Sequence, residues 1–140
     1  KVEIAEGLLQ GGQAMQRDLA LVHLDAPVAE HIAPIPLAPP STLVGFSQVD
    51  VFSYGRDHAF IVSVQRDCDI LSRHSTVMKS NCEAVPGVSG APLILEGASG
   101  PSLAGVIVGA NSSDMPLNPG PGAAAVIVDP IAFDALLCDL

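Results

Sequence analysis

The sequence is poor in aromatic residues and in positive charge. It contains no Trp, one Tyr and four Phe, although 49% of its 140 residues are hydrophobic. A core of this composition must be built mainly from Val, Ile, Leu and Ala. Six Lys and Arg residues stand against 15 Asp and Glu, which gives a formal net charge of −9. Because phosphate groups are bound by clustered positive charge, the composition argues against nucleic acid or an anionic membrane as the partner.

The sequence also lacks long apolar runs and a recognisable leader. No hydrophobic stretch approaches the roughly 20 residues of a membrane-spanning helix. The opening residues KVEI have neither the basic region nor the apolar stretch of a signal peptide. Thirteen Gly and 12 Pro interrupt the chain and disfavour a helical bundle. We therefore expect a soluble, loop-rich and β-rich protein of one domain or two small lobes.

Short apolar segments predict the fold class. They recur between residues 43 and 128, and most are separated by Gly, Pro, Asn, Asp or Ser. This spacing is typical of an antiparallel sandwich or barrel. Upstream, residues 2–6 alternate like a short strand, and LALVHL at 19–24 is typical of a strand covered on both faces. Five prolines within 25–40 exclude a central strand or a helix, so we expect an extended linker there.

The C-terminal residues predict a short helix docked on the β-rich body. Asp129 is a suitable N-cap, and Pro130 fits the first helical position. Four apolar side chains from Phe133 to Leu140 follow at the i, i+3, i+4 and i+7 spacing of one helical face.

The three cysteines predict a disulfide with one thiol left over. Cys68 and Cys82 flank a segment whose Ser-Arg-His-Ser centre resembles a hairpin tip. A disulfide that closes a loop of this size is worth about 3 kcal/mol, and it would imply maturation in an oxidising compartment. Two unrelated buried thiols are the alternative. Cys138 would then be a free thiol or the partner of a cysteine elsewhere.

The segment PGVSGAP at 86–92 is the first candidate for chemistry. Two glycines flank Ser89, and such a turn can direct the backbone N–H groups of Gly87 and Ser89 at one point, as in an oxyanion hole. An ordinary Gly/Ser turn is the alternative. The segment is not the Gly-x-Ser-x-Gly elbow of α/β-hydrolases, because position 91 is Ala and a predicted strand follows.

Asp18 is the second candidate, because it lies at the mouth of the apolar run 19–24. A carboxylate at a buried position is costly unless another group stabilises its charge. A histidine is one such group, and Asp18 would then be the acid of a Ser–His–Asp arrangement. A solvated carboxylate beside Arg17 is the alternative.

These segments together resemble those of a known family. RDLALVHLDAPV is similar to the catalytic-aspartate strand of the chymotrypsin-like (trypsin-fold) serine endopeptidases, and GVSGAP is similar to their nucleophile loop. In the same order, IPLAPP resembles the linker between the two barrels of that family, and VDVFSYGRD resembles the start of the second barrel. LAGVIVGA resembles the strand that pairs with substrate, and the Asp-Pro helix resembles the C-terminal helix. The resemblance is greatest to compact bacterial trypsin-like peptidases with few disulfides.

The resemblance implies an all-β, chymotrypsin-like Greek-key barrel with a short C-terminal helix. Residues 1–26 would be the end of the first barrel and carry the aspartate strand, and residues 27–42 would be the linker. Residues 43–129 would form the second barrel with its nucleophile loop, and residues 130–140 would form the helix.

The resemblance also implies roles for individual residues. Ser89 matches the nucleophile, Asp18 matches the acid that orients the histidine, and the backbones of Gly87 and Ser89 match the oxyanion hole. An acid at position 83 would pair with a cationic substrate side chain, although a surface carboxylate is the alternative. The implied substrate-binding residues are Glu83, Val108, Gly109, Ala110 and Gly122.

Val88 departs from the pattern of the larger trypsin-like enzymes. They carry an Asp at this position, which pairs with a new N-terminal amine on activation. Valine cannot form that ion pair, so we expect packing and the Cys68–Cys82 bridge to hold the oxyanion turn.

The histidine is the larger departure from the family. The family's catalytic histidine precedes the aspartate, yet none of the residues before Asp18 is His, and all four histidines follow it. Their spacing fits no metal site, and we expect no cofactor. A serine hydroxyl without a base is a poor nucleophile at neutral pH. An imidazole placed between the two groups would need the Asp18 carboxylate about 6–8 Å from the Ser89 hydroxyl.

The expected function is therefore that of a secreted or periplasmic serine endopeptidase that acts on polypeptides. The 140-residue chain would be its C-terminal part and inactive alone, with the missing N-terminal part or a second copy as its partner. Apolar surface left uncovered near residues 19–24 would favour dimerisation or poor solubility. The alternatives are a non-catalytic homologue that serves as a peptide-binding or interaction module, and a generic β-barrel with chance motifs.

Overall fold

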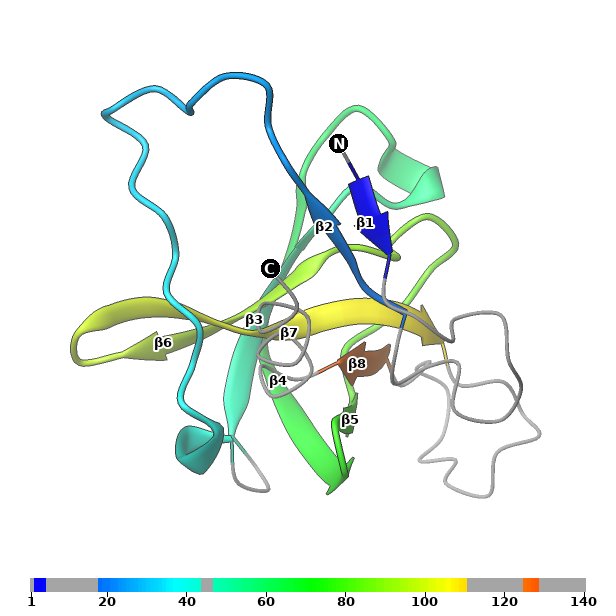
Figure 1. Ribbon diagram of the computed structural model, residues 1–140. Helices are drawn as coiled ribbons and strands as arrows, with labels where there is room; N and C mark the ends of the chain where they lie inside the picture. Colours follow the sequence, from blue (N-terminus) through cyan, green and yellow to red (C-terminus); the bar gives the residue numbers. More distant parts are fainter. Residues whose placement is uncertain (1, 5–17, 44–46, 111–124, 129–140) are drawn as a thin grey trace.

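Strands dominate the described part of the computed structural model, which comprises residues 2–4, 18–43, 47–110 and 125–128 (Figure 1). Two short 3-10 helices, η2 (Pro40–Thr42) and η3 (Arg56–His58), interrupt them. The predicted C-terminal helix, Cys138 and Gly122 lie outside the described residues. The strands are β1 (Val2–Ile4), β2 (Ala20–Val22), β3 (Gln48–Ser53), β4 (Ser63–His74), β5 (Val77–Ser80), β6 (Pro92–Gly97), β7 (Gly100–Ala110) and β8 (Ala125–Val128).

Six of these strands form a closed antiparallel barrel in the order β3-β4-β5-β8-β7-β6. The barrel closes where β3 pairs with β6, at Asp50↔Ile94 and Val51↔Leu93. Four of the strand pairs contain register shifts, which increase local twist and help a small sheet to curl on itself. The predicted antiparallel barrel is confirmed.

The barrel interior is filled mainly by aliphatic side chains, as the low aromatic content of the sequence predicts. Met78, Leu93 and Ile107 are fully buried, and they come from three different strands. The core continues beyond the strands, because Val88 in the turn before β6 is also buried. Packing in the core therefore extends from the barrel into the PGVSGAP segment.

A buried carboxylate fixes an irregularity of β4. Asp50 on β3 is only 7% exposed. Its Oδ2 accepts a hydrogen bond from Arg66 Nη1 at 2.7 Å, and its Oδ1 accepts one from the Asp67 N–H at 3.0 Å. Asp67 has a φ of 56°, in the left-handed region, beside the register shift between β3 and β4. The two bonds to Asp50 stabilise this bulge.

We expect Arg66→Gln to destabilise the protein more than Asp50→Asn. The Arg66 side chain is 66% exposed and returns to water when its partner is neutralised, so Asp50→Asn should cost about 1 kcal/mol of unfolding free energy. Arg66→Gln leaves a carboxylate that is only 9% exposed without its cation and should cost about 2–3 kcal/mol. Urea unfolding of both variants measures the difference, and the reverse order would contradict this role of Asp50.

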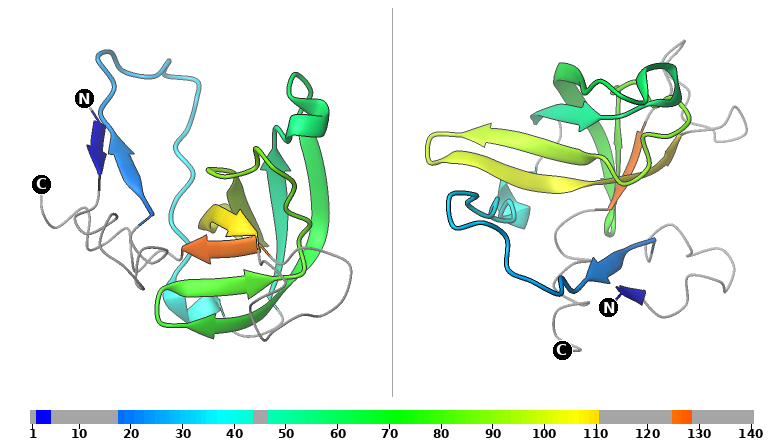
Figure 2. Two further views of the ribbon diagram at one scale, coloured as in Figure 1. Left: turned by 90° about the vertical axis from the view of Figure 1, so that its right-hand side faces the viewer. Right: turned by 90° about the horizontal axis from the view of Figure 1, so that it is seen from above.

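Strands β1 and β2 form a separate two-stranded sheet that lies beside the barrel and contributes no strand to it (Figure 2). The expectation that residues 19–24 form a strand covered on both faces is wrong for most of the run. Leu19 is buried, but the strand spans only Ala20–Val22, and Val22 and Leu24 are 58% and 63% exposed. A continuous apolar run predicts coverage by other layers, and β2 has only β1 as a paired neighbour among the described strands.

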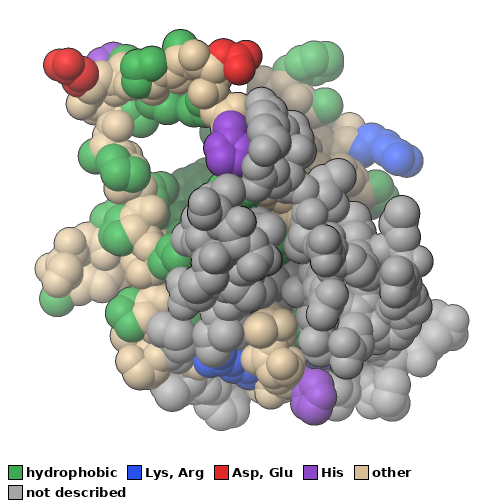
Figure 3. All heavy atoms as spheres, viewed as in Figure 1, with side chains coloured by type: hydrophobic (Ala, Val, Ile, Leu, Met, Phe, Trp, Pro, Cys, Tyr) green, Lys and Arg blue, Asp and Glu red, His purple; other side chains and the backbone are tan. Residues whose placement is uncertain are grey.

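The proline-rich segment is an extended linker, as predicted. Between residues 23 and 39 it forms no strand or helix, and its end adds a parallel bridge to β7 at Leu37↔Leu103. The Ala38 N–H donates to the Leu103 carbonyl, and the Leu103 N–H donates to the Pro36 carbonyl, both at 2.8 Å. Its apolar side chains are largely exposed, as the space-filling view shows along the upper left of the molecule (Figure 3).

Candidate active site

The turn before β6 leaves two neighbouring backbone N–H groups without a described acceptor. Within it, the Val88 N–H donates to the Val85 carbonyl at 3.3 Å and the Ala91 N–H to the Val88 carbonyl at 2.9 Å. The Gly90 N–H donates to the Ile107 carbonyl at 2.7 Å. No described residue accepts a hydrogen bond from the N–H of Gly87 or Ser89. These are the two amides that sequence analysis assigned to an oxyanion hole.

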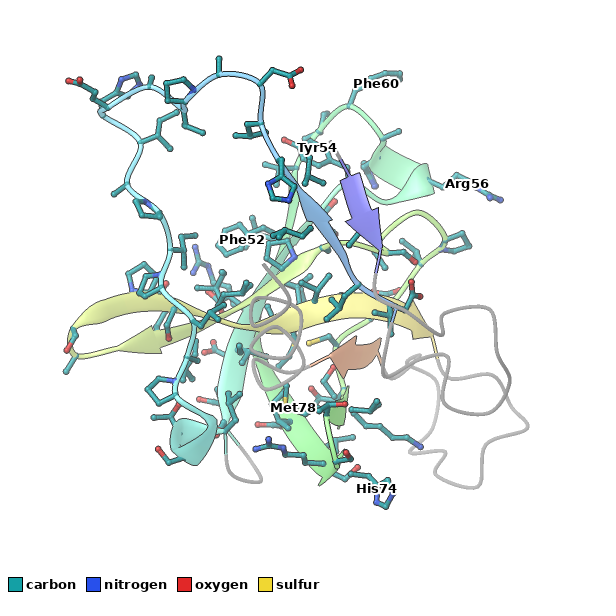
Figure 4. The ribbon with its side chains drawn as sticks, in the orientation of Figure 1. Phe52, Tyr54, Arg56, Phe60, His74 and Met78 are labelled. Atoms are coloured by element: carbon teal, nitrogen blue, oxygen red, sulfur yellow. The ribbon has the colours of Figure 1, made fainter. Side chains whose placement is uncertain are left out.

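Glycine conformation and backing by a neighbouring loop shape this turn. Gly87 has a φ of 101° and Gly90 a φ of 88°, which L side chains rarely adopt. A Cβ on Gly87 would lie 3.1 Å from the Arg56 nitrogen. The Arg56 N–H donates to the Pro86 carbonyl at 2.8 Å, so the first residue of η3 is hydrogen-bonded to the turn. In Figure 4 the Arg56 side chain points outward, so its backbone makes this contact.

Two neighbouring residues of the turn differ in burial, so their side chains face opposite ways. Val88 packs in the barrel core, while Ser89 on the next position is exposed. The valine thus stabilises the turn by packing, whereas the Cys68–Cys82 bridge that was also expected to hold the turn is not formed. A serine hydroxyl at the surface, flanked by amides with no described acceptor, is the arrangement that an acyl-transfer site requires.

The predicted substrate strand runs beside this turn. The ladder between β6 and β7 ends at Pro92↔Val106, and two hydrogen bonds of Ile107 with the turn continue it. Val108 and Gly109 follow directly and are half-buried. Ala110 is the last residue of β7, and Glu83 is exposed upstream of the turn.

Asp18 is exposed and immediately precedes the buried Leu19. The histidines His23, His31, His58 and His74 are exposed as well. His74 lies at the end of the barrel opposite to Tyr54 and Arg56, which flank the turn (Figure 4).

The predicted disulfide is not present, because Cys68 and Cys82 are free thiols. Both are buried, and the Cys68 thiol donates a hydrogen bond to Gln65 Oε1 at 3.3 Å. The neighbouring Cys82 side chain is the largest cause that raises the pKa of Cys68, followed by burial. The Cys68 side chain is in turn the largest cause that lowers the pKa of Cys82, against the opposing effect of burial. The spacing of the cysteines predicted that they are neighbours but not their chemical state.

We expect Cys68→Ala to raise the pKa of Cys82, because it removes the neighbouring side chain that is the largest cause of the lowered pKa and leaves the burial. Cys82→Ala should lower the pKa of Cys68, so the two variants shift in opposite directions. A lowered pKa in the folded state means that the Cys82 thiol adds stability as the pH rises toward its unfolded pKa. Thiolate absorbance during a pH titration of the reduced protein measures the pKa of the remaining thiol in each variant. Shifts of the two pKa values in the same direction would exclude this coupling between Cys68 and Cys82.

Sequence analysis missed Gln65, whose side chain contacts the segment before the turn at 86–92. Its Oε1 accepts hydrogen bonds from the Glu83 N–H at 2.7 Å and from the Cys68 thiol at 3.3 Å. A single glutamine on a strand carries no sequence signal for such a contact, because the partner is 18 positions away.

No group of three or more His, Cys, Asp or Glu side chains in the described ranges is arranged to hold a metal ion. No helix within the same ranges has the length and hydropathy needed to cross a membrane.

Comparison with known proteins places the fold. No protein-family model and no curated protein matches the sequence. Among solved structures, the chain is similar to the secreted serine protease VesC from Vibrio cholerae, with a TM-score of 0.72 and 14% sequence identity. The match covers 99% of this chain and 32% of VesC. At this identity the likeness shows the fold, a chymotrypsin-like β-barrel, and the chain spans about a third of the length of VesC.

Proposed function

We propose that the protein is a chymotrypsin-like serine endopeptidase in which Ser89 is the nucleophile. The observation that carries the proposal is the pair of N–H groups of Gly87 and Ser89, which have no described acceptor and flank an exposed hydroxyl. Attack by the Ser89 oxygen on a peptide carbonyl forms an oxyanion, and two such amides stabilise it. The carbon–nitrogen bond then breaks, the amine leaves with the proton, and water hydrolyses the acyl-enzyme.

The base in this proposal is a histidine outside the 140 residues, oriented by Asp18. None of the four histidines precedes Asp18, where the family has its base. The partner that supplies this histidine is the N-terminal part of the same protease. A second copy of this chain is the other partner considered, and it would cover exposed surface without adding a histidine from outside these residues. The exposed apolar residues Val22 and Leu24 beside Asp18 give such a partner a surface to cover. The similarity to a protein described as secreted supports a secreted or periplasmic location.

The proposed substrate is a polypeptide that lies along the end of β7. Beyond Val106 no described strand pairs with the β6 side of β7, whereas the other side pairs with β8 as far as Ala110↔Ala125. The added strand of substrate would pair with the β6 side, around Val108 and Gly109. Ala110 and Gly122 would line the pocket for the side chain next to the scissile bond. The carboxylate of Glu83 would favour a cationic side chain in that pocket.

Labelling with a serine-directed phosphonate tests the proposal. The chain is treated alone and in the presence of its natural upstream segment, and mass spectrometry identifies the modified residue. We expect Ser89 to be labelled in the mixture and much more slowly in the chain alone, because the base is missing there. Absence of labelling in both samples would favour the alternative function, a non-catalytic homologue that binds peptides through the same surface.

A further inference from the structure

We infer that Gln65 is a positioning residue for the substrate pocket and that it determines selectivity for a cationic side chain through Glu83. The inference rests on the proposed function. Gln65 lies on β4 opposite Val51 of β3, at the register shift of that pair. Its side chain links the barrel wall to the backbone six residues upstream of Ser89.

The segment between β5 and the nucleophile turn is held to β4 by side chains. The ladder of β4 and β5 ends at Ile70↔Ser80. At the next residue, the Asn81 Oδ1 accepts from the Asp69 N–H at 2.7 Å, and its Nδ2 donates to Asp69 Oδ2 at 3.0 Å. Two residues later, the Glu83 N–H donates to Gln65 Oε1 at 2.7 Å. Asn81 also keeps one backbone bond, because its N–H donates to the Asp69 carbonyl at 3.1 Å. At Glu83 a side-chain oxygen takes the place of backbone pairing.

The bulge in β4 explains why a side chain is needed at this point. Between Val49↔Cys68 and Val51↔Gln65, β4 contains one residue more than β3, and Asp67 there has a left-handed φ of 56°. A bulge disrupts the regular ladder and redirects nearby side chains. The Cys68 thiol, which donates to the same Oε1 at 3.3 Å, holds the Gln65 carboxamide in the orientation that accepts the Glu83 N–H.

Burial shows what this contact positions. Cys82 and Ala84 are buried, whereas Glu83 between them is exposed, so its side chain faces away from the core. A fixed Glu83 N–H limits rotation of the backbone that carries the carboxylate. The nucleophile turn has its own supports, at Arg56 and Ile107. Loss of the Gln65 contact should therefore affect charge selectivity in the pocket more than the reactivity of Ser89.

The test compares Gln65→Leu, which removes the acceptor, with Gln65→Glu, which keeps it. Gln48→Leu, on the exposed start of β3, is the matched control. Each chain is combined with its upstream segment and assayed on peptides with Arg or Ala before the scissile bond. We expect Gln65→Leu to reduce the Arg preference about tenfold, roughly the value of one net hydrogen bond. The change should appear in KM, with kcat and phosphonate labelling nearly unchanged, while Gln65→Glu and Gln48→Leu retain the preference.

Amide hydrogen exchange in the 140-residue chain alone gives a second readout that needs no activity. Exchange at the Glu83 N–H should be about tenfold faster in Gln65→Leu than in the unmodified chain or in Gln65→Glu. Unchanged exchange, or an unchanged Arg preference in an active enzyme, would overturn the inference. An unmodified assembly that neither cleaves nor labels would refute the proposed function instead and with it the role in selectivity, whereas the exchange result would still show whether Gln65 holds Glu83.

Discussion

Ser89→Ala is expected to abolish phosphonate labelling and to reduce peptide hydrolysis by roughly 10⁴-fold or more, since loss of a nucleophile leaves only binding and oxyanion stabilisation. Because Ser89 is exposed, the substitution should change the unfolding free energy by less than about 0.5 kcal/mol. Mass spectrometry of the labelled chain and initial rates of the assembly with the upstream segment measure the effect.

Ser99→Ala is the matched control for this experiment. Ser99 is an equally exposed serine in the turn between β6 and β7. Its substitution should leave labelling and hydrolysis unchanged. Retained labelling or retained hydrolysis in Ser89→Ala would mean that another residue is the nucleophile and would refute the proposed function.

Gly87→Ala is expected to lower the labelling rate of Ser89 by about 10²- to 10³-fold, the usual effect of losing one oxyanion donor. Alanine is strained at the Gly87 φ of 101°, and its Cβ would lie 3.1 Å from the Arg56 nitrogen. The turn must therefore shift, which would displace the amides of the proposed oxyanion hole. The same strain should cost about 1–3 kcal/mol of unfolding free energy.

Gly100→Ala separates the two effects of that substitution. Gly100 has nearly the same φ, 104°, but a Cβ there would meet nothing within 4 Å, and the residue starts β7 at the turn with β6. The Gly100→Ala protein should lose a similar amount of unfolding free energy, and its Ser89 should still be labelled at the normal rate. Equal losses of labelling in both variants would show that general destabilisation, and not the oxyanion turn, is responsible.

The sequence predicts features that depend on local patterns. Glycine on both sides of Ser89 permits the positive φ values of the turn, and short apolar runs mark β3, β5, β6, β7 and β8. The apolar run at 59–64 marks β4 poorly, because β4 begins only at Ser63 and extends to His74. Apolar residues such as Phe60 and Ile61 are instead exposed in the preceding loop, where no hydrophobic pattern could identify them as surface residues.

Features that depend on distant contacts could not be predicted. The contact between Gln65 and Glu83 requires a bulge in β4 that no residue type specifies. The free state of Cys68 and Cys82 depends on how their side chains meet, and spacing alone does not determine it. The exposure of Val22 and Leu24 reflects which layers surround β2, which an apolar run does not reveal.

A crystal structure of the phosphonate adduct, formed with the upstream segment present, tests the central claim most directly. The proposal predicts phosphorus bonded to the Ser89 oxygen, with the phosphoryl oxygen about 2.7–3.1 Å from the amide nitrogens of both Gly87 and Ser89. An adduct whose phosphoryl oxygen contacts neither nitrogen, or one formed on a different residue, would contradict it.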